Sequence, residues 1–161
     1  MFYQLNRTIM SIEIIAFTDE TSQFIKTLNY EWLEKYFKVE AGDEISLSNP
    51  KKYIIDKGGF IFYAKINGKI VGTYSLLKEE NNMYQLGKMA VSNETQGLGI
   101  GTFLLEHCLK TAQDKGIKKL ILYSNTKLKS AIHLYEKYGF YEIELDKGLY
   151  ERANIKMEKL L

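Results

Sequence analysis

The chain has 161 residues, which is enough for one domain that buries its own core without disulfides or metal ions. Its 22 basic and 20 acidic residues are spread along the sequence and leave a net charge of +2, so neither a nucleic-acid partner nor a membrane partner is expected. One proline argues against disorder, and the single cysteine, Cys108, excludes an internal disulfide.

The start of the sequence carries no recognisable targeting signal. Residues 1–8 lack the basic and then apolar layout of a signal peptide, and no apolar run approaches the ~18 residues that span a bilayer. We therefore expect a cytoplasmic protein. Residues 1–9 show no clear hydrophobic period, so residues 1–10 are interpreted as a candidate N-terminal extension of a single domain that spans residues 1–161.

Hydrophobic periodicity predicts a strand and then helices in the first third of the chain. The strand spans residues 11–17, and the helical pattern that follows spans residues 18–38, as one helix or as two with a break near Asn29. Residues 39–48 are acidic and turn-like. A short helix then begins at Pro50, because proline is favoured at the first helical position.

The next segment is expected to form a meander of three antiparallel strands. Residues 60–66 and 69–77 are two strands joined by Asn67-Gly68, which is the strongest short signal for a β-hairpin. The third strand spans residues 83–91.

The second half of the chain alternates helices and strands. An amphipathic helix follows residue 100 and ends near Gly116, and Cys108 lies on its apolar face, where an inert core thiol is expected. The elements expected after it are a strand at 119–124, a helix at 129–138, a strand at 140–145, a polar loop at 146–153 and a strand at 154–160. The order strand, helix, strand implies that 83–91 and 119–124 pair in parallel.

A glycine-rich loop, Gln96-Gly97-Leu98-Gly99-Ile100-Gly101, joins the third meander strand to the amphipathic helix. Glycines let a ligand lie directly against backbone N–H groups, and the unpaired amides of a first helical turn carry partial positive charge, a combination that binds phosphate. The spacing matches neither the dinucleotide motif nor a P-loop. A flexible turn that needs positive φ is the structural alternative, and a nucleotide-phosphate-binding domain is the functional one.

The spacing Gln-x-x-Gly-x-Gly, with the segment Ala-Ile-His-Leu-Tyr-Glu-Lys-Tyr-Gly-Phe at 131–140, resembles the GNAT superfamily of acyl-CoA-dependent N-acyltransferases. The order of elements is similar too, over roughly residues 12–160, whereas the specific motifs lie only between residues 85 and 140. The resemblance implies a mixed α/β fold (α+β), with a mostly antiparallel sheet of about seven strands, about four flanking helices and a splayed central pair of strands.

The resemblance also implies that acetyl-CoA is the co-substrate and that no metal takes part. The residues implied for binding it are Met89, Ala90, Val91, Gln96, Gly97, Leu98, Gly99, Ile100, Gly101, Thr102, Asn125 and Tyr135. Amides of residues 96–102 would bind the pyrophosphate, with Gln96 bracing the loop, and the backbone of Met89 and Val91 would pair with the pantetheine arm. Gly87 would suit a bulge in that strand or plain close packing. Asn125 would donate to the same arm or form a turn.

Two residues are implied for catalysis. Tyr135 is a candidate general acid, because a phenol with a pKa of about 10 keeps its proton until a thiolate departs. Its helical spacing also fits a core aromatic. Gln85 stands where many relatives carry a glutamate base, and an amide can orient a water but cannot take the proton. Either the amine arrives neutral or another carboxylate serves; the candidates are Glu40, Asp43, Glu79 and Glu151, each of which also fits a solvated surface charge.

The resulting hypothesis is an N-acetyltransferase that moves acetyl from acetyl-CoA directly to a primary amine. The acceptor, which segment 30–44 would roof, is a small molecule, a peptide N-terminus or a lysine. A non-catalytic acyl-CoA-binding sensor is the alternative, motivated by Gln85. His107 and His133 have no partner at metal-ligand spacing. The oligomeric state is open, a homodimer included.

Overall fold

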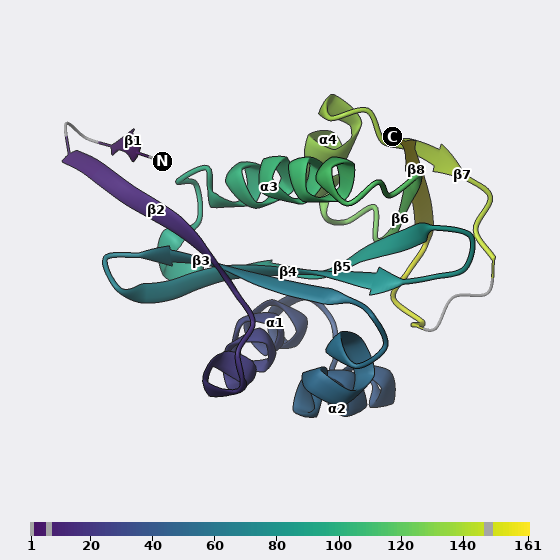
Figure 1. Ribbon diagram of the computed structural model, residues 1–161, viewed down its shortest axis with the longest axis horizontal. Helices are drawn as coiled ribbons and strands as arrows, with labels where there is room; N and C mark the ends of the chain where they lie inside the picture. Colours follow the sequence, from purple (N-terminus) through teal and green to yellow (C-terminus); the bar gives the residue numbers. More distant parts are fainter. Residues whose placement is uncertain (1, 6–7, 147–149) are drawn as a thin grey trace.

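The described residues of the computed structural model, 2–5, 8–146 and 150–161, form an eight-stranded sheet in the order β1-β2-β3-β4-β5-β6-β8-β7 (Figure 1). The strands are β1 Phe2–Leu5, β2 Thr8–Ala16, β3 Phe60–Ile66, β4 Lys69–Lys78, β5 Met83–Val91, β6 Lys119–Ser124, β7 Tyr141–Ile143 and β8 Ile155–Leu160. Every neighbouring pair is antiparallel except β5 and β6. The expected fold class is confirmed, and β1 adds a strand where only an extension was expected.

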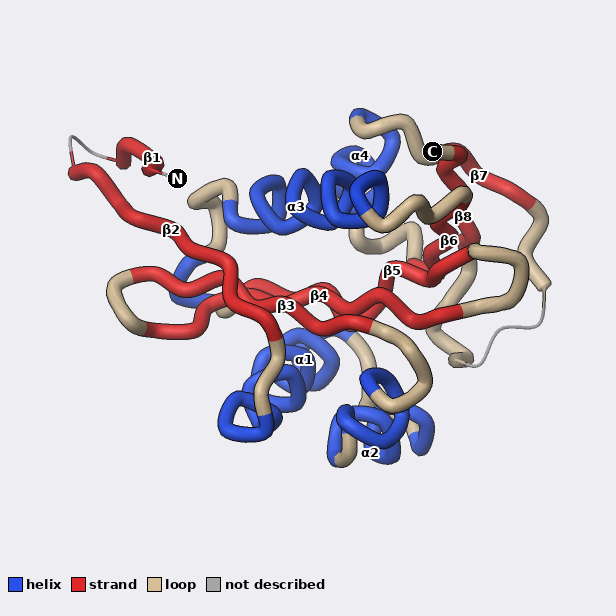
Figure 2. The backbone as a smooth tube through the Cα atoms, viewed as in Figure 1, coloured by secondary structure: helices blue, strands red, loops and turns tan. Residues whose placement is uncertain are grey.

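The helices cover both faces of this sheet. They are α1 Ser22–Tyr36, α2 Ala41–Ser48, α3 Ile100–Asp114 and α4 Lys129–Lys137, with 3₁₀ helices at Asp19–Thr21 and Asn93–Thr95. The short helix expected at Pro50 is a π-helix at Lys51–Ile55, with Pro50 as its N-cap. Figure 2 shows α1 and α2 on one side of the strands and α3 and α4 on the other. Within the described part of the chain, no helix has the length and apolar character needed to cross a membrane.

Each face of the sheet has its own apolar core. On one face, α3 contributes a buried row that includes Leu104, Leu105 and Cys108. On the other, Ile25 and Leu33 of α1 pack with residues of β3. Cys108 is fully buried, and burial raises the pKa of its thiol to about 12, so the expected inert core thiol is confirmed.

Local signals located most elements accurately. β3, β5 and β6 have the bounds expected from the sequence, and the β3–β4 turn places Asn67 at φ 49° and Gly68 at φ 81°, as a two-residue hairpin requires. The first helix runs through Asn29 without a break, and β7 is shorter than the expected 140–145. Residues 1, 6, 7 and 147–149, which belong to the expected extension and the expected loop at 146–153, lie outside the described residues.

The expectation of a turn at residues 39–48 is wrong, because most of this segment is helix α2. Its acidic residues form a capping box: Glu40 is the N-cap, and the Asp43 carboxylate accepts a hydrogen bond from the Glu40 N–H at 2.9 Å. The negative charges that suggested a solvated turn therefore begin the helix, where a helix dipole favours them.

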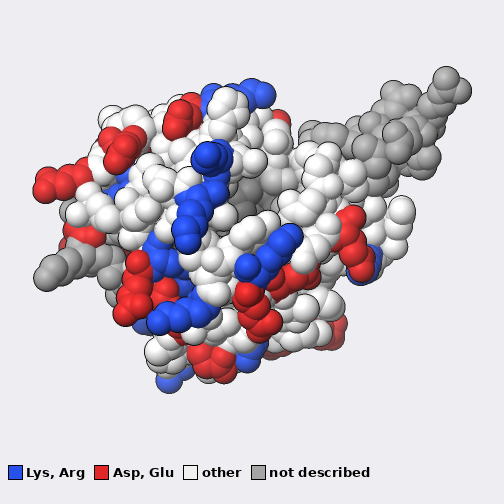
Figure 3. All heavy atoms as spheres, turned by 180° about the vertical axis from the view of Figure 1, so that it is seen from behind, with Lys and Arg blue, Asp and Glu red and all other residues white. Residues whose placement is uncertain are grey.

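The parallel pair β5 and β6 separates soon after it forms. Pairing covers only Met83–Gln85 against Lys119–Ile121, so β5 continues from Leu86 without β6 beside it. The expected splayed pair is thus confirmed, and its carboxyl ends open near the start of α3. Surface charge is mixed around this framework: Figure 3 shows basic and acidic side chains intermingled on one face of the molecule.

Candidate active site

The glycine loop leaves the start of α3 uncovered. Gly97 and Gly99 have φ of 79° and 80°, the left-handed region that favours glycine, and Gly99 is the N-cap of α3. A Cβ added at Gly97 or Gly101 would meet no heavy atom within 4 Å. The Gln96 side chain donates a hydrogen bond to the Val91 carbonyl at 3.0 Å, which ties the loop to the end of β5. This arrangement suits an anionic ligand lying against the first-turn amides.

Gly72 of β4, outside the glycine loop, sets how closely α3 approaches the sheet. A Cβ at Gly72 of β4 would lie 2.9 Å from Leu104 Cδ1 and 3.1 Å from Ile100 Cγ2. Because Gly72 has no Cβ, the first turns of α3 pack directly against β4 beside the opening of β5 and β6.

The edge of β5 that β6 leaves open carries the backbone N–H of Val91. The Ser92 N–H donates to Val71 of β4 at 2.8 Å, and Gly72 stands opposite Val91 in the register. Since successive N–H groups of a strand point to opposite edges, the Val91 N–H faces away from β4, toward the side that β6 has left. A ligand in this opening could therefore pair with β5 as another strand would.

Tyr135 of α4 reaches the same opening. Its hydroxyl lies 3.9 Å from Met89 Sδ, and its ring makes an edge contact with Phe140, with the centroids 5.8 Å apart. Tyr135 is partly buried, and burial raises the pKa of its phenol to about 12. The ring therefore packs as a core aromatic does, while the hydroxyl points at the free segment of β5.

Gln85 lies where β5 and β6 part. It is the last residue of β5 in the parallel register, opposite Ile121, and is partly buried. Its Nε2 atom would be 3.7 Å from a Cβ on Gly87, so the amide overlies the glycine. Gln85 thus stands beside the opening, where it can orient a water or a substrate.

The bulge expected at Gly87 is present one residue later. The register with β4 changes from Ser75 opposite Gly87 to Thr73 opposite Ala90, which gives β5 an extra residue, and Lys88 has φ 51°. The Lys88 carbonyl accepts a hydrogen bond from the buried Asn29 amide of α1 at 3.0 Å. The bulge therefore turns a backbone group of β5 toward α1.

Asn125 forms the turn that was its alternative role. Its Nδ2 donates to the Arg152 carbonyl at 2.6 Å, and its Oδ1 accepts from the Lys127 N–H at 2.8 Å. These contacts tie the loop after β6 to the segment before β8. The role of Asn125 toward the pantetheine arm stays a prediction.

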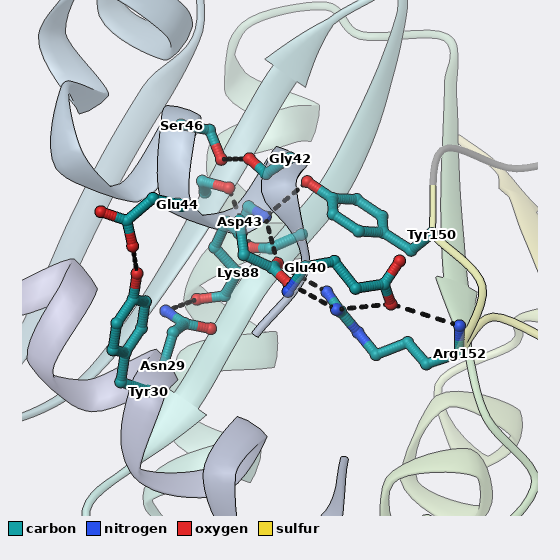
Figure 4. Close-up of polar contacts among 12 residues, drawn as sticks. Asn29, Tyr30, Glu40, Gly42, Asp43, Glu44, Ser46, Lys88, Tyr150 and Arg152 are labelled. Atoms are coloured by element: carbon teal, nitrogen blue, oxygen red, sulfur yellow. Dashed lines mark hydrogen bonds and ion pairs between the residues drawn. The ribbon is translucent and has the colours of Figure 1, made fainter. Parts of the chain in front are cut away.

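One of the four candidate bases, Asp43, is buried, and a second, Glu40, is partly buried, contrary to the expectation of solvated charges. Asp43 is 0% exposed and accepts from Arg152 through both guanidinium nitrogens, at 2.6 and 2.8 Å, and from Lys88 Nζ at 3.2 Å (Figure 4). Burial would raise the pKa of the Asp43 carboxyl, but Arg152, the Glu40 N–H and Lys88 hold it below its usual value. A carboxylate with these partners is a poor proton acceptor.

Glu40 is engaged in the same cluster, whereas the other two candidates lie outside it. Its carboxylate, in a side chain 12% exposed, accepts from the Glu151 N–H at 2.9 Å and from Arg152 Nη1 at 3.2 Å. The Glu151 side chain is 81% exposed and pairs with Lys38. Glu79 follows β4, where its N–H bonds to the Met83 carbonyl. Three of the four candidates, Glu40, Asp43 and Glu151, are therefore paired with basic side chains.

Sequence reasoning missed the basic half of this cluster. Lys88 Nζ donates to the Tyr150 hydroxyl at 2.8 Å, and the Arg152 guanidinium lies 4.3 Å from the Tyr150 ring and 5.7 Å from the Trp32 ring. A lysine inside an otherwise apolar strand was the one available signal for Lys88. Arg152 and Tyr150 stand in a polar loop and gave none.

The two histidines lie apart from the Asp43 cluster. His107 of α3 lies on the other face of the sheet, where its Nδ1 is 2.8 Å from the Tyr74 hydroxyl and its ring contacts Phe62, and His133 is exposed on α4. Across the residues that the structure describes, no three His, Cys, Asp or Glu side chains are grouped so that they could hold a metal ion.

The fold and the glycine loop define a mixed α/β protein with a candidate anion site beside a split sheet. The model of the family described as Acetyltransferase (GNAT) family matches residues 25–140, more than half of the chain. The chain therefore belongs to the GNAT family of acetyltransferases, which confirms the resemblance.

Two relatives illustrate the similarity in sequence. N-acetyltransferase 8 of Rattus norvegicus is 30% identical over 95 residues, which are 56% of this chain and 43% of the relative. An uncharacterized N-acetyltransferase of Methanocaldococcus jannaschii is 29% identical over 133 residues, 73% of this chain and 58% of the relative. The chain thus spans about half the length of these relatives.

Solved structures share the fold over almost the whole chain. A GNAT acetyltransferase of Staphylococcus aureus superimposes with a TM-score of 0.84 at 26% identity, covering 93% of this chain and 99% of its own. The PaiA N-acetyltransferase of Thermoplasma acidophilum, solved in complex with coenzyme A, gives 0.73 at 23% identity, covering 94% and 100%. At that identity the second comparison shows the fold alone.

Proposed function

We propose that this protein is an N-acetyltransferase that moves the acetyl group of acetyl-CoA directly to a primary amine. The observation that carries the proposal is the meeting of three features at one opening: the uncovered glycine loop, the free edge of β5 and the Tyr135 hydroxyl. Membership of the GNAT family supports an acetyl group as the group that is transferred. The Thermoplasma acidophilum neighbour, solved in complex with coenzyme A, supports coenzyme A as the carrier of that group.

The residues present fit acyl-CoA. First-turn amides of α3 and the amides of residues 96–102 would bind the pyrophosphate, since nothing stands within 4 Å of a Cβ at Gly97 or Gly101. The backbone of Met89, Ala90 and Val91 would pair with the pantetheine arm. The outward Val91 N–H would polarise the thioester carbonyl.

Tyr135 is proposed as the general acid. The neutral amine nitrogen attacks the thioester carbon, the bond to sulfur breaks, and the Tyr135 hydroxyl gives its proton to the departing thiolate. The acylated nitrogen loses one proton to water, and the Tyr135 phenolate takes one back from water, so that the products are the amide and the free thiol. The raised pKa of this phenol, about 12, keeps the hydroxyl protonated at neutral pH. Positioning of the two substrates supplies most of the remaining rate.

Gln85, in the place of a glutamate base, predicts a distinctive pH profile. An alkyl amine of pKa about 10.4 is neutral in a fraction near 10⁻³ at pH 7, rising tenfold per pH unit. The log of kcat/KM should therefore climb with a slope near one up to about pH 9. Gln85→Glu should raise kcat/KM at pH 7 on the order of tenfold and flatten the climb, which steady-state assays from pH 6 to 9 would measure.

The control for Gln85→Glu is Gln113→Glu, which adds the same charge on the exposed side of α3 and should leave the profile unchanged. A wild-type profile that is already level near pH 7, and that Gln85→Glu does not improve, would contradict the prediction. It would point to a base elsewhere, and Glu79 and Glu151 would be substituted next.

A thiol-release assay tests the function itself. Acetyl-CoA is offered with tyramine, free lysine and a tripeptide with an unblocked N-terminus, which represent the three acceptor classes. Release of CoA that depends on one of these amines supports the enzyme. Gln85 and the engaged carboxylates favour one alternative, an acyl-CoA-binding sensor, which would bind acetyl-CoA in calorimetry and release nothing. The cytoplasmic location and the homodimer left open by the sequence stay predictions.

A further inference from the structure

The buried cluster around Asp43 joins three segments that lie far apart in the sequence. Figure 4 shows Asp43 at the start of α2, Lys88 in the bulge of β5, and Arg152 before β8 converging on one point. Asp43 is 0% exposed, Lys88 9% and Arg152 14%. These contacts are therefore shielded from solvent and are stronger than surface ion pairs.

One side of the cluster holds the bulge. Lys88 has a left-handed backbone, and its Nζ contacts Asp43 Oδ1 at 3.2 Å and the Tyr150 hydroxyl at 2.8 Å. Its carbonyl is held separately by Asn29 Nδ2, whose other contact is the Ile25 carbonyl of α1. The bulged residue is thus fixed at both its backbone and its side chain, directly before the segment Met89–Val91.

The other side holds the loop before β8. Arg152 is bound to Asp43 through two nitrogens, and its carbonyl accepts from Asn125. The Glu40 carboxylate accepts the N–H groups of Glu151 and Arg152. Tyr150 packs so closely on α2 that a Cβ at Gly42 would come within 3.1 Å of its ring. Residues 150–152 are therefore bound to α2 and to its N-cap.

Asp43 is the acidic residue that contacts both sides of the cluster. Its two oxygens bridge the Lys88 ammonium and the Arg152 guanidinium, whereas Glu40 binds the loop alone. Without the Asp43 charge, the Lys88 ammonium, 9% exposed, would lose its carboxylate partner, and the Arg152 guanidinium would keep only Glu40. Leaving buried charges unpaired is costly, so the bulge and the loop would separate.

We propose that Asp43 is a positioning residue for acyl transfer. It couples the Lys88 bulge of β5 to residues 150–152, so that both keep a fixed position beside segment 30–44, which is expected to roof the acceptor. The inference rests on the proposed acetyltransferase function for its kinetic consequence. The coupling itself is a property of the free protein. Asp43 acts through Lys88 and Arg152 and exchanges no proton with the substrates.

Hydrogen exchange of the free protein tests the coupling. In Asp43→Asn, a near-isosteric change that removes the charge, amides of residues 86–91 and 150–154 should exchange at least about tenfold faster, together, because the bulge and the loop lose their common anchor. Amides of α3 should be unchanged. Faster exchange at only one of the two segments, or at neither, would overturn the coupling.

Kinetics separate positioning from general loss of structure. With whichever of tyramine, lysine and the unblocked tripeptide the wild type acetylates, Asp43→Asn should raise the KM for the amine on the order of tenfold and lower kcat by a similar factor. Its affinity for acetyl-CoA in calorimetry should fall by a smaller factor than the KM for the amine rises, because residues 96–102, which are proposed to bind the pyrophosphate, lie outside both exchange segments. An unchanged KM for the amine would overturn the proposed role.

Two further variants complete the test, one as a control and one as a replacement for Asp43→Asn. Glu158→Gln removes the carboxylate charge of another partly buried pair, Lys119–Glu158 at 3.3 Å, and should change neither exchange segment. Lys88→Met retains the apolar stem and removes the ammonium that contacts both Asp43 and the Tyr150 hydroxyl; it replaces Asp43→Asn should that variant not fold, with the same expected exchange and kinetics. If the wild type binds no acetyl-CoA, the proposed function fails, and hydrogen exchange still decides the coupling.

Discussion

Replacing Gly99 by glutamate is expected to weaken the binding of acetyl-CoA on the order of 100-fold or more. Gly99 has φ 80°, so a side chain there adds about 1 kcal/mol or more of backbone strain. The new carboxylate would also stand at the N-cap of α3, against the pyrophosphate that the first-turn amides are proposed to bind. A loss of about 2.7 kcal/mol corresponds to 100-fold in Kd, which isothermal calorimetry would measure.

The same helix offers a matched control. Gly116 follows the C-terminal end of α3 with φ 69°, and a Cβ there meets no heavy atom within 4 Å. Gly116→Glu therefore adds the same charge and similar backbone strain far from the glycine loop. It should bind acetyl-CoA as the wild type does. A folded Gly99→Glu protein with wild-type affinity would show that the loop is a structural turn, the alternative left open by its sequence.

Much of the fold follows from signals that are local in the sequence. Asn67-Gly68 fixes a hairpin because both residues tolerate positive φ, and apolar segments bounded by turn residues give β3, β5 and β6 their limits. The glycine loop predicts the start of α3 for the same reason. Each of these features depends on residues within a few positions of one another, so a single sequence is enough to recognise them.

The missed features depend on partners distant in the chain. Asp43 could be assigned to a solvated turn because its partners, Lys88 and Arg152, lie 45 and 109 positions away. Burial of four charges in one cluster is unfavourable unless all are paired, and nothing in the local sequence shows that they are. The same limit applies to the bulge: Gly87 suggested it, but the contact from Asn29 lies with Lys88, 59 positions along the chain.

The site was predictable to the extent that it uses backbone. Gly97, Gly99 and Gly101 identify a candidate anion site because the absence of side chains is itself the signal. The roles of the side chains were harder to predict from the sequence. Gln85 lies beside the opening, but its amide cannot act as a base. The Asn125 side chain bonds to the Arg152 carbonyl before β8. Functional roles of side chains depend on what they face, and that is a property of the folded chain.

Replacing Tyr135 by phenylalanine is expected to lower kcat on the order of 10- to 1000-fold while leaving the affinity for acetyl-CoA within about twofold. The substitution removes one hydroxyl, whose contact with Met89 Sδ at 3.9 Å contributes little, and keeps the ring against Phe140. Stability should therefore change by less than about 0.5 kcal/mol. Single-turnover kinetics, thermal unfolding and calorimetry would measure the three quantities separately.

The control for Tyr135→Phe is Tyr138→Phe, the same change at the end of the same helix, where the hydroxyl bonds to the exposed Glu106 instead of facing β5. It should retain kcat. The pH dependence gives a second check: burial raises the pKa of Tyr135 to about 12, so the acid stays protonated and its role alone should cause no fall in kcat between about pH 6 and 9. Wild-type kcat in a folded Tyr135→Phe protein would assign the tyrosine to the core and leave the thiolate to depart without a proton from this residue.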